Sequence, residues 1–526
     1  MKKRFFSFIA IVSICCVLCV SMPFSAYAQD DFASSAIIND FVGAGNLVPG
    51  EICVIFKSSS AVNLNSSKDL SDTLGIDITS FDVMFDSARR TETTLSSTVD
   101  TSKNDTTARK ATSVLTLKIA DHSQSSVNAA ITQLNKRDDV LVAFQNSYYE
   151  IEPMTYSTTS STNNLDWNRT ETGFDTAYDC GFANADSVTI AVLSSGCDSD
   201  SDLEENVVWN LAYNVYENNN DVTDTNGMGS STIRLLAADY DDGVGMDGLL
   251  QSANVIPVKI TIGEGSWVSG ATIAGGITYA NDCGADIICF PSDFSIYDKT
   301  AEVVSAYLEF DGLVITNAGE DADGVSMDIE DSIYDDGKIN LPSNWIVVGM
   351  GGENRTVAPG AFYNDTYVDL FAPGYEVWFG NSDGTSGNYG TDSEIAAAHV
   401  TAACALLMHK ATHKTPLQIK QLLLDNVTEV AVMESLCVSG GYLNLQNAVD
   451  ALFAEIRAAY SKGDVNGDGL ITTADYELCK SIFMGTEIAT QQQLNAADVA
   501  GSAGIDRYDY IAIQRHCNKT LYIAPY

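Results

Sequence analysis

The residues best spaced for chemistry form an oxygen-rich loop near the C-terminus, at residues 464–475. Carboxylate, amide and hydroxyl groups recur at alternate positions, and Gly469 supplies the turn at position 6. Hard cations prefer such oxygen ligands, so the segment predicts a calcium loop, followed by a helix over residues 476–484. The expected ligands are Asp464, Asn466, Asp468, the carbonyl of Leu470, Thr472 and Asp475.

A second loop of the same length follows at residues 498–509, with fewer oxygen ligands. Its third position is Ala500, and its sixth, where a glycine would make the turn, is Ala503. Each replacement removes a feature that the first loop keeps, so weaker calcium binding is expected here. The candidate ligands that remain are Asp498, Ser502, Asp506 and Asp509.

Residues 390–400 hold a different candidate chemistry, because Ser393, Glu394 and His399 stand close together where a helical pattern begins. Covalent hydrolysis needs a nucleophile, an imidazole that takes its proton and a carboxylate that orients the imidazole. The chain has only five histidines, so a base for Ser393 is hard to find. Glu394 could pair with Glu320 for acid–base work, but such a pair still lacks a plain nucleophile.

Elements that would position these residues alternate along residues 165–455. Apolar runs typical of buried strands are separated or followed by helical patterns. Such alternation predicts an α/β domain in which helices cover both faces of a parallel sheet. The strand runs are residues 188–193, 255–260, 286–290, 313–316 and 345–349, and the helical patterns are residues 269–283, 300–310 and 395–409.

The N-terminal part divides into four segments. Residues 1–28 have a basic start, an apolar run and a small-x-small ending at Ala26-Tyr27-Ala28, which predicts a secretion signal. Residues 29–46 are expected to form a leader and residues 154–164 a polar linker. Between them, residues 47–153 predict a small α+β domain. Its expected strands are residues 51–56, 112–119 and 139–144, its helix is residues 126–134, and residues 91–110 are expected to form a loop.

Composition excludes several classes of protein. The chain carries 28 Lys and Arg against 70 Asp and Glu, so it lacks the basic surface that nucleic acid requires. After the signal, no apolar run is long enough to span a membrane. Of the twelve cysteines, three fall in the signal, and the rest show no metal-binding spacing. A secreted chain without a transmembrane segment is therefore expected.

Five landmarks in residues 165–455 together resemble the subtilisin-like serine proteases. The strand run that ends at Gly196 resembles the family's Asp-x-Gly strand, and residues 224–231 resemble Asp-x-Asn-Gly-His-Gly-Thr-His. Residues 368–374, Val-Asp-Leu-Phe-Ala-Pro-Gly, match the family unaltered. Residues 390–400 resemble its nucleophile helix, and residues 440–444 its closing turn. The resemblance implies the subtilisin-like fold for this domain.

The same resemblance implies that the catalytic groups are lost. Ser194 stands at the position of the aspartate and Met228 at that of the histidine. Glu394, five residues before His399, stands at the position of the serine. Glu320 replaces the asparagine that would stabilise the oxyanion, and a carboxylate there would repel the negative charge. Ser393 is one residue further from His399, so it is only a weak alternative nucleophile.

Residues 47–153 resemble the propeptide of the same family, through residues 134–140 and 146–149. A chain without catalytic groups would not remove this domain itself. Residues 460–526, with their paired loops, resemble a dockerin, the calcium-dependent module that binds cohesin domains of cellulosome-type scaffolds. By that resemblance the cohesin contacts are Thr473 and Ala474 in the first loop, and Arg507 and Tyr508 in the second.

These observations predict a secreted, scaffold-docked pseudoprotease that binds a peptide or a protease-related ligand in the family's substrate cleft. Its link to polysaccharide catabolism would come only through the scaffold. An active serine endopeptidase with a non-standard catalytic set remains an alternative. A structural spacer within the complex is a third reading.

Overall fold

The structure is a computed structural model. The expected signal, all but the last residue of the expected leader and the loop at residues 91–110 lie outside the residues that it describes. No helix in the described part combines the length and apolar character needed to cross a membrane. The described residues are 46–57, 64–87, 111–151, 154–158, 165–241, 243, 245–263, 266–291, 299–321, 323–329, 341–380, 387–459, 462–467, 470–500 and 504–518.

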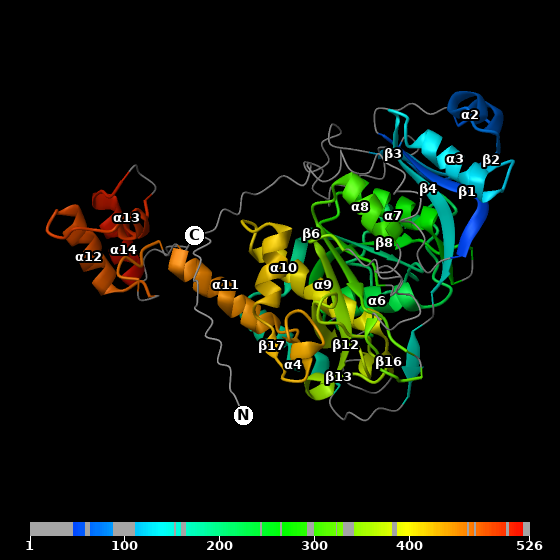
Figure 1. Cartoon of the computed structure of the whole chain (residues 1–526). Helices are drawn as coiled ribbons and strands as arrows, with labels where there is room; N and C mark the ends of the chain where they lie inside the picture. The colour runs from blue at the N-terminus through cyan, green and yellow to red at the C-terminus, as the bar shows by residue number, and fades with distance from the viewer. Residues whose placement is uncertain are drawn as a thin grey trace, which may run out of the picture.

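A ten-stranded sheet forms the centre of the molecule, in the order β17-β18-β14-β12-β11-β10-β6-β8-β7, with β13 paired to β12 (Figure 1). The seven neighbouring pairs from β18 to β7 are parallel, as the alternating pattern predicted. The strands are β6 (Asn184–Ser194), β7 (Tyr213–Asn214), β8 (Ser252–Lys259), β10 (Ile287–Cys289), β11 (Leu313–Asn317), β12 (Trp345–Gly352), β13 (Thr356–Val357), β14 (Leu370–Pro373), β17 (Thr428–Glu429) and β18 (Gly441–Tyr442).

Helices cover both faces of this sheet because its strands are apolar on both sides. In β6, Ile190 and Val192 pack in one hydrophobic cluster, and Ala191 and Leu193 pack in the other. The first cluster includes side chains of α4 (Trp167–Thr172), α5 (Phe174–Asp179), α6 (Met228–Ala237), α9 (Ser393–Lys410), α10 (Pro416–Leu424) and α11 (Leu445–Ala459). The second includes side chains of α7 (Gly270–Asp282) and α8 (Lys299–Leu308).

The N-terminal domain has the predicted α+β character. Its elements are β1 (Asn46–Lys57), α2 (Ser67–Leu74), β2 (Ile78–Asp86), β3 (Ala111–Ile119), α3 (Gln124–Leu134) and β4 (Val140–Glu150). Successive side chains of β1 point to opposite faces of the N-terminal sheet, and each face packs against a different layer of helices. Ile52 and Val54 pack with α2 and α3, whereas Cys53 and Ile55 face α7 of the central domain.

The two domains share backbone pairing as well as a hydrophobic core. Strand β4 pairs antiparallel with β9 (Trp267–Ser269), so a strand of the central domain completes the N-terminal sheet. Asn146 Nδ2 donates to Glu51 Oε2 (3.0 Å), and Asn146 Oδ1 accepts from the backbone N–H of Ala271 (3.0 Å). The N-terminal domain therefore packs against the side of the central domain that α7 covers.

A small sheet and short helices complete the central domain. The sheet has the order β15-β16-β5, formed by β15 (Val377–Gly380), β16 (Gly387–Thr391) and β5 (Thr155–Ser157). Strand β5 lies within the segment expected to be a linker, and the sequence did not predict it. The 3-10 helices are Trp209–Leu211, Glu353–Arg355 and Met433–Ser435.

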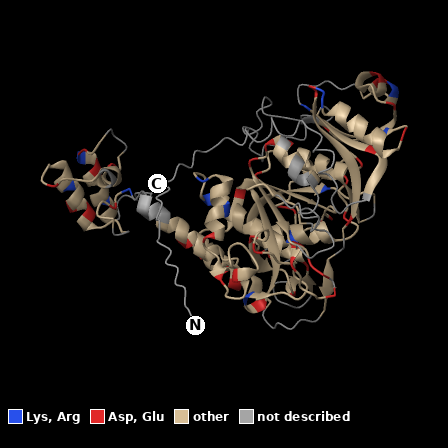
Figure 2. Cartoon of the chain, in the orientation of Figure 1, with Lys and Arg blue, Asp and Glu red and all other residues tan. Residues whose placement is uncertain are grey.

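Three helices form the C-terminal group: α12 (Thr473–Phe483), α13 (Gln491–Ala497) and α14 (Arg507–Cys517). They enclose a small core of Val465, Cys479, Ala497 and Ile513. The ring of Tyr510, near the start of α14, lies 5.4 Å from Phe483 and 6.2 Å from Tyr476, both of α12, so the two helices pack against each other. Acidic residues are spread over this group and the central domain alike (Figure 2).

Candidate functional site

Helix α9 begins directly after β16, and its first amides are held by carboxylates. Asp392 is the N-cap residue, and its Oδ1 accepts from the backbone N–H of Glu394 (2.9 Å). Glu320 Oε2 accepts from the backbone N–H of Ser393 (2.9 Å). The positive end of a helix dipole stabilises such anions. The Ser393 amide at the start of this helix is thus already bonded to Glu320.

The hydroxyl of Ser393 is turned into the protein. Its Oγ accepts from Asn317 Nδ2 (2.7 Å) at the end of β11, and both residues are almost fully buried. Glu394, the next residue, is also buried. The structure therefore brings the two candidate residues of the sequence, Ser393 and Glu394, to the helix start together with Glu320. It joins Ser393 to both Glu320 and Asn317.

Ser194 and Met228 lie at the ends of two elements that meet. Ser194 ends β6, and Met228 is the first residue of α6; each is 1% exposed. Ser195 Oγ accepts from the backbone N–H of Gly229 (2.9 Å). A Cβ on Gly229 would lie 2.1 Å from the carbonyl oxygen of Gly196, so only glycine allows this approach. The end of β6 and the start of α6 are thus closely packed. Neither Ser194 nor Met228, which lie there, carries an ionisable group.

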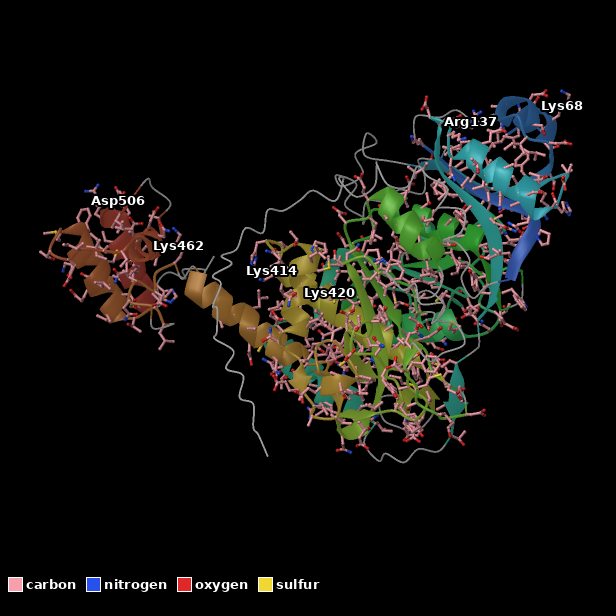
Figure 3. All side chains as sticks on the ribbon, viewed as in Figure 1. Lys68, Arg137, Lys414, Lys420, Lys462 and Asp506 are labelled. Atoms are coloured by element: carbon pink, nitrogen blue, oxygen red, sulfur yellow. The ribbon has the colours of Figure 1, made fainter. Side chains whose placement is uncertain are left out.

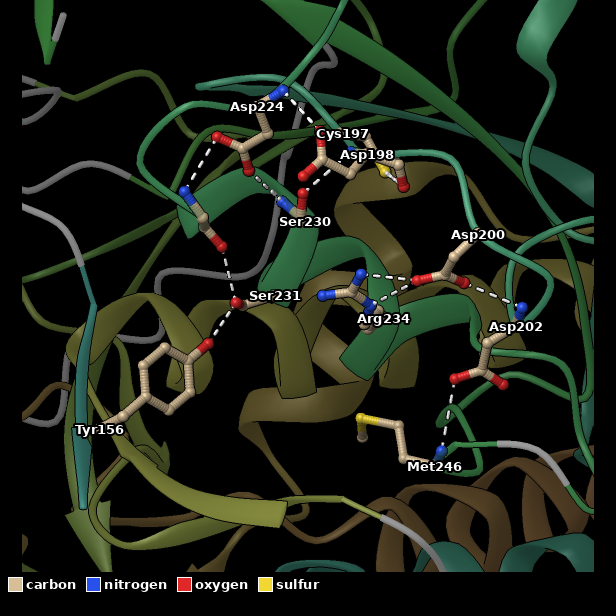
Figure 4. Close-up of polar contacts among 11 residues, drawn as sticks. Tyr156, Cys197, Asp198, Asp200, Asp202, Asp224, Ser230, Ser231, Arg234 and Met246 are labelled. Carbon is tan, nitrogen blue, oxygen red and sulfur yellow. Dashed lines mark hydrogen bonds and ion pairs between the residues drawn. The ribbon is translucent and has the colours of Figure 1, made fainter. Parts of the chain in front are cut away.

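Two aspartates in the loops that precede α6, Asp200 and Asp224, hold this helix in place (Figure 4). The sequence did not predict these contacts. Asp224 accepts from the backbone N–H groups of Gly227 (3.0 Å) and Ser230 (2.8 Å). Asp200 forms an ion pair with Arg234 of α6, with 2.6 Å between Oδ2 and Nη2. The spacing of Asp224, Gly227 and Ser230 could have predicted these bonds, since an aspartate side chain can accept from backbone amides a few residues further along the chain.

His399 is fully buried, and both of its ring nitrogens are hydrogen-bonded. Its Nδ1 bonds the carbonyl oxygen of Ile395 (2.8 Å), and its Nε2 bonds Asn168 Nδ2 (2.9 Å). The carbonyl must accept, so Nε2 accepts from the amide and the ring is neutral. Burial lowers the pKa of His399 to about 4. Within the described part of the chain, no hydrogen bond joins an imidazole to Ser393.

This histidine predicts a pH dependence of stability. Its pKa is lower in the folded chain than in the unfolded chain, near 6.5, so unfolding takes up a proton as the pH falls between these values. His399 should therefore lower the free energy of unfolding by roughly 3 kcal/mol between pH 6.5 and pH 4. Urea unfolding at both pH values measures it. His399→Gln should lose this part of the pH dependence, whereas His413→Gln, at an exposed position, should keep it. Equal pH profiles for wild type and His399→Gln would contradict the assignment.

The first C-terminal loop is closed around its twelfth residue. Asp475 is fully buried; its Oδ1 accepts from the backbone N–H of Asn466 (3.0 Å) and its Oδ2 from that of Thr472 (2.7 Å). Asp464 Oδ1 accepts from the backbone N–H of Gly467 (2.8 Å). The bonds close the loop around its carboxylates, although no three His, Cys, Asp or Glu side chains of the described residues are placed together as a metal site. Asp468, another predicted ligand, lies outside the described residues.

The second loop repeats this arrangement despite its missing ligands. Asp509 is fully buried and accepts from the backbone N–H groups of Ala500 (2.7 Å) and Asp506 (2.6 Å). Asp498 Oδ1 is a buried carboxylate oxygen without a hydrogen-bond partner. A buried, unpaired carboxylate oxygen is costly unless a cation binds it, so this atom fits calcium. Ser502 lies outside the described residues.

The predicted partner-binding residues lie at the starts of α12 and α14. Thr473 and Ala474 are exposed at the start of α12. The Arg507 guanidinium lies 4.9 Å from the ring centroid of Tyr508 at the start of α14. Small side chains at one end and a stacked cation and aromatic ring at the other make the two ends chemically different. Asp506, the N-cap residue of α14, is labelled in Figure 3.

Comparison with known families confirms the class of protein. Residues 185–449, about half of the chain, match the subtilase family, and residues 462–518 match the dockerin type I domain. The chain belongs to the subtilase family and carries a C-terminal dockerin type I domain. Dockerin type I domains in general bind calcium and cohesins.

Two curated relatives show the extent of the similarity. The chain is 29% identical over 223 residues to the cell wall-associated protease of Bacillus subtilis (strain 168), covering 41% of this chain and 23% of that protein. It is 27% identical over 219 residues to the thermophilic serine proteinase of Bacillus sp. (strain AK1), covering 41% and 51%. The matched part thus spans about a quarter and about half of these relatives.

Solved structures support the fold. Fervidolysin from Fervidobacterium pennivorans, a keratinolytic enzyme related to subtilisin, aligns with a TM-score of 0.53 at 16% identity, covering 77% of this chain and 62% of that one. The epidermin leader peptide processing serine protease of Staphylococcus aureus aligns with a TM-score of 0.52 at 15% identity, covering 76% and 99%. At such low identity the alignments establish the subtilisin-like fold alone.

Proposed function

We propose that this chain is a secreted subtilisin-like pseudoprotease that acts by binding and is mounted on a cellulosome-type scaffold through its dockerin. Its protein partner would be a cohesin, bound in the presence of calcium. The subtilase domain would bind an extended peptide or a protease-related ligand. The subtilase and dockerin matches support the coarse outline, and the side chains near α9 support the loss of catalysis.

The contact between Glu320 and the start of α9 carries the proposal. Acyl transfer needs hydrogen-bond donors aimed at the developing oxyanion. Here Glu320 Oε2 accepts from the backbone N–H of Ser393 at 2.9 Å, so one such donor is engaged by a carboxylate. An external oxyanion at this amide would have to displace Glu320 and then lie beside its negative charge. Met228 and Ser194 supply neither a base nor an acid that orients one.

A covalent fluorophosphonate probe tests this proposal. We expect the full-length chain to show no saturating, site-specific labelling under conditions that fully label an active subtilisin. The reason is that Ser393 is buried, and among the described residues its hydroxyl is hydrogen-bonded to the Asn317 amide and to no base. Ser393→Ala is the matched control and should behave as the wild type does. Labelling that saturates in the wild type and disappears in Ser393→Ala would overturn the pseudoprotease assignment.

An active serine endopeptidase with a non-standard catalytic set is the second candidate. The hydrogen bond between Asn317 Nδ2 and Ser393 Oγ favours it, because it fixes the hydroxyl in one position. This candidate predicts labelling at Ser393. It also predicts that the chain would cut between its N-terminal and central domains, whereas a pseudoprotease would keep residues 47–153 attached in a host without other proteases.

If the subtilase domain binds no ligand, the remaining hypothesis is that it is a structural spacer within the complex. It predicts calcium-dependent cohesin binding by the dockerin and no peptide binding by the subtilase domain. Cohesin binding measured with and without a chelator tests the part that both readings share. Binding that persists unchanged in the chelator would remove the calcium-dependent docking proposal.

A further inference from the structure

Asn226 and Gly227 form an asparagine–glycine pair in the turn that leads into α6, and both residues are half-buried. Such a pair can react with itself, because the backbone nitrogen of the glycine can attack the Cγ atom of the asparagine side chain. Glycine favours the attack, since it has no Cβ to hinder the approach. The groups that surround the two reacting atoms decide whether a folded chain helps or prevents this reaction.

The attacking nitrogen is bonded to a carboxylate. The backbone N–H of Gly227 donates to Asp224 Oδ1 (3.0 Å), and Asp224 is buried. The same oxygen accepts from the backbone N–H of Asn226 (3.2 Å), while Oδ2 accepts from that of Ser230 (2.8 Å) (Figure 4). Asp224 is therefore fixed beside the proton that the Gly227 nitrogen must lose. A positioned base of this kind contributes about 10²–10⁴-fold to a rate.

The carboxamide of Asn226 is held by its oxygen. Its Oδ1 accepts from the backbone N–H of Met228 (3.1 Å), which fixes the side chain over the turn. The same N–H stabilises the negative charge that develops on Oδ1 when Cγ is attacked. Nδ2, the atom that would leave, is buried and has no hydrogen-bond partner among the described residues. Its loss breaks no hydrogen bond and removes a buried donor that is costly to leave unpaired.

We infer that Asn226 and Gly227 are a self-modifying site, at which the folded chain converts Asn226 to aspartate or isoaspartate. A bond forms between the Gly227 nitrogen and Cγ of Asn226, and the bond between Cγ and Nδ2 breaks. Asp224 takes the proton from Gly227 and passes it to the departing nitrogen, which leaves as ammonia. Water then opens the cyclic imide at either of its two carbonyl groups. This inference does not depend on the proposed binding function.

The product carries a new carboxylate directly before Met228. It lies at the start of α6, where the positive end of the helix dipole stabilises a negative charge. Isoaspartate also lengthens the backbone by one methylene group, and so displaces the start of α6 from Ser195, which now accepts from the backbone N–H of Gly229. Because ammonia is lost, the change is one-way, and the start of α6 differs between newly made and aged protein.

The test compares the folded full-length wild type with the same chain in guanidinium chloride, at one pH and temperature. Peptide mass spectrometry follows the conversion of Asn226, and a protein isoaspartyl methyltransferase detects isoaspartate. We expect conversion at least about tenfold faster in the folded chain, since only folding holds the base and the donor in place. The other asparagine–glycine pair of the sequence, Asn466 and Gly467, is the internal reference and should react as fast as Asn226 in the unfolded chain. A folded rate equal to or below the unfolded rate would overturn the inference.

Two variants assign the role of the base. Asp224→Asn should lower the rate in the folded chain to that of the unfolded chain. Asp221→Asn is the matched control and should keep the wild-type rate, because Asp221 is exposed in the same loop and bonds Thr223 instead. A wild-type rate in folded Asp224→Asn would also show the inference to be wrong. Asp224 supports the start of α6, so circular dichroism checks the fold of this variant, and the comparison of folded with unfolded wild type decides the question without it.

Discussion

Asp475→Ala is expected to lower the calcium affinity of the first dockerin loop by at least about 100-fold, and with it cohesin binding. Asp475 stands at the twelfth ligand position, and its carboxylate also accepts the backbone N–H groups of Asn466 and Thr472. Its removal takes a charged ligand from the cation and leaves two amides without their acceptor. Loop closure and metal binding would fail together.

Calcium titration calorimetry on the full chain measures this effect. Glu477→Ala is the matched control, because Glu477 is exposed on the same helix and should leave calcium binding unchanged. Asp509→Ala, at the equivalent position of the second loop, should have the smaller effect, since that loop has fewer oxygen ligands and is expected to bind calcium more weakly. Unchanged calcium affinity in Asp475→Ala would refute the assignment of this loop.

Lys420→Met is expected to destabilise the central domain by about 3–5 kcal/mol, because it breaks a buried ion pair. Lys420 Nζ lies 3.0 Å from Asp369 Oδ1, and the two side chains are only 18% and 11% exposed. Asp369 Oδ2 accepts from the backbone N–H of Val347 (2.9 Å). Burial raises the pKa of Asp369, and Lys420 opposes that shift. Without the lysine, a carboxylate would remain buried and unpaired.

Urea unfolding followed at neutral pH measures the loss. Lys410→Met, at an exposed position at the end of α9, is the control and should change stability by less than about 0.5 kcal/mol. The double variant Lys420→Met with Asp369→Asn should recover part of the loss, because no buried charge is then left unpaired. A Lys420→Met variant as stable as the wild type would show that solvent reaches the pair.

Five of the ten strands of the central sheet, β6, β8, β10, β11 and β12, were predicted because their signal is local. A run such as residues 188–193 is apolar at every position, and only a strand with both faces covered buries such a run. The observed β6 contains it and extends it at both ends. The helix over residues 395–409 was predicted in the same way, although its start at Ser393 depends on capping by Asp392.

Contacts between distant segments could not be predicted in this way. Asp369 lies in a stretch that matches the subtilase family unaltered, yet nothing in that stretch indicates its pairing with Lys420. Tyr156 lies in a polar segment that was expected to be a linker, and its strand exists only because β16 offers an edge to pair with. Such partners lie far apart in sequence, so local composition carries no trace of them.

The sequence alone determined the subtilase and dockerin classes and the alternating central domain, and it is the basis for proposing Ser194, Met228, Glu320 and Glu394 at the family's catalytic positions. These follow from residue identity and short-range spacing. Only the tertiary structure decided that the Glu320 carboxylate bonds the Ser393 amide, that the Ser393 hydroxyl faces Asn317, and that β5 covers the edge of β16. Each of these contacts joins elements that become neighbours only when the sheets and helices pack, because hydrogen bonds act over about 3 Å and carry no signal along the chain.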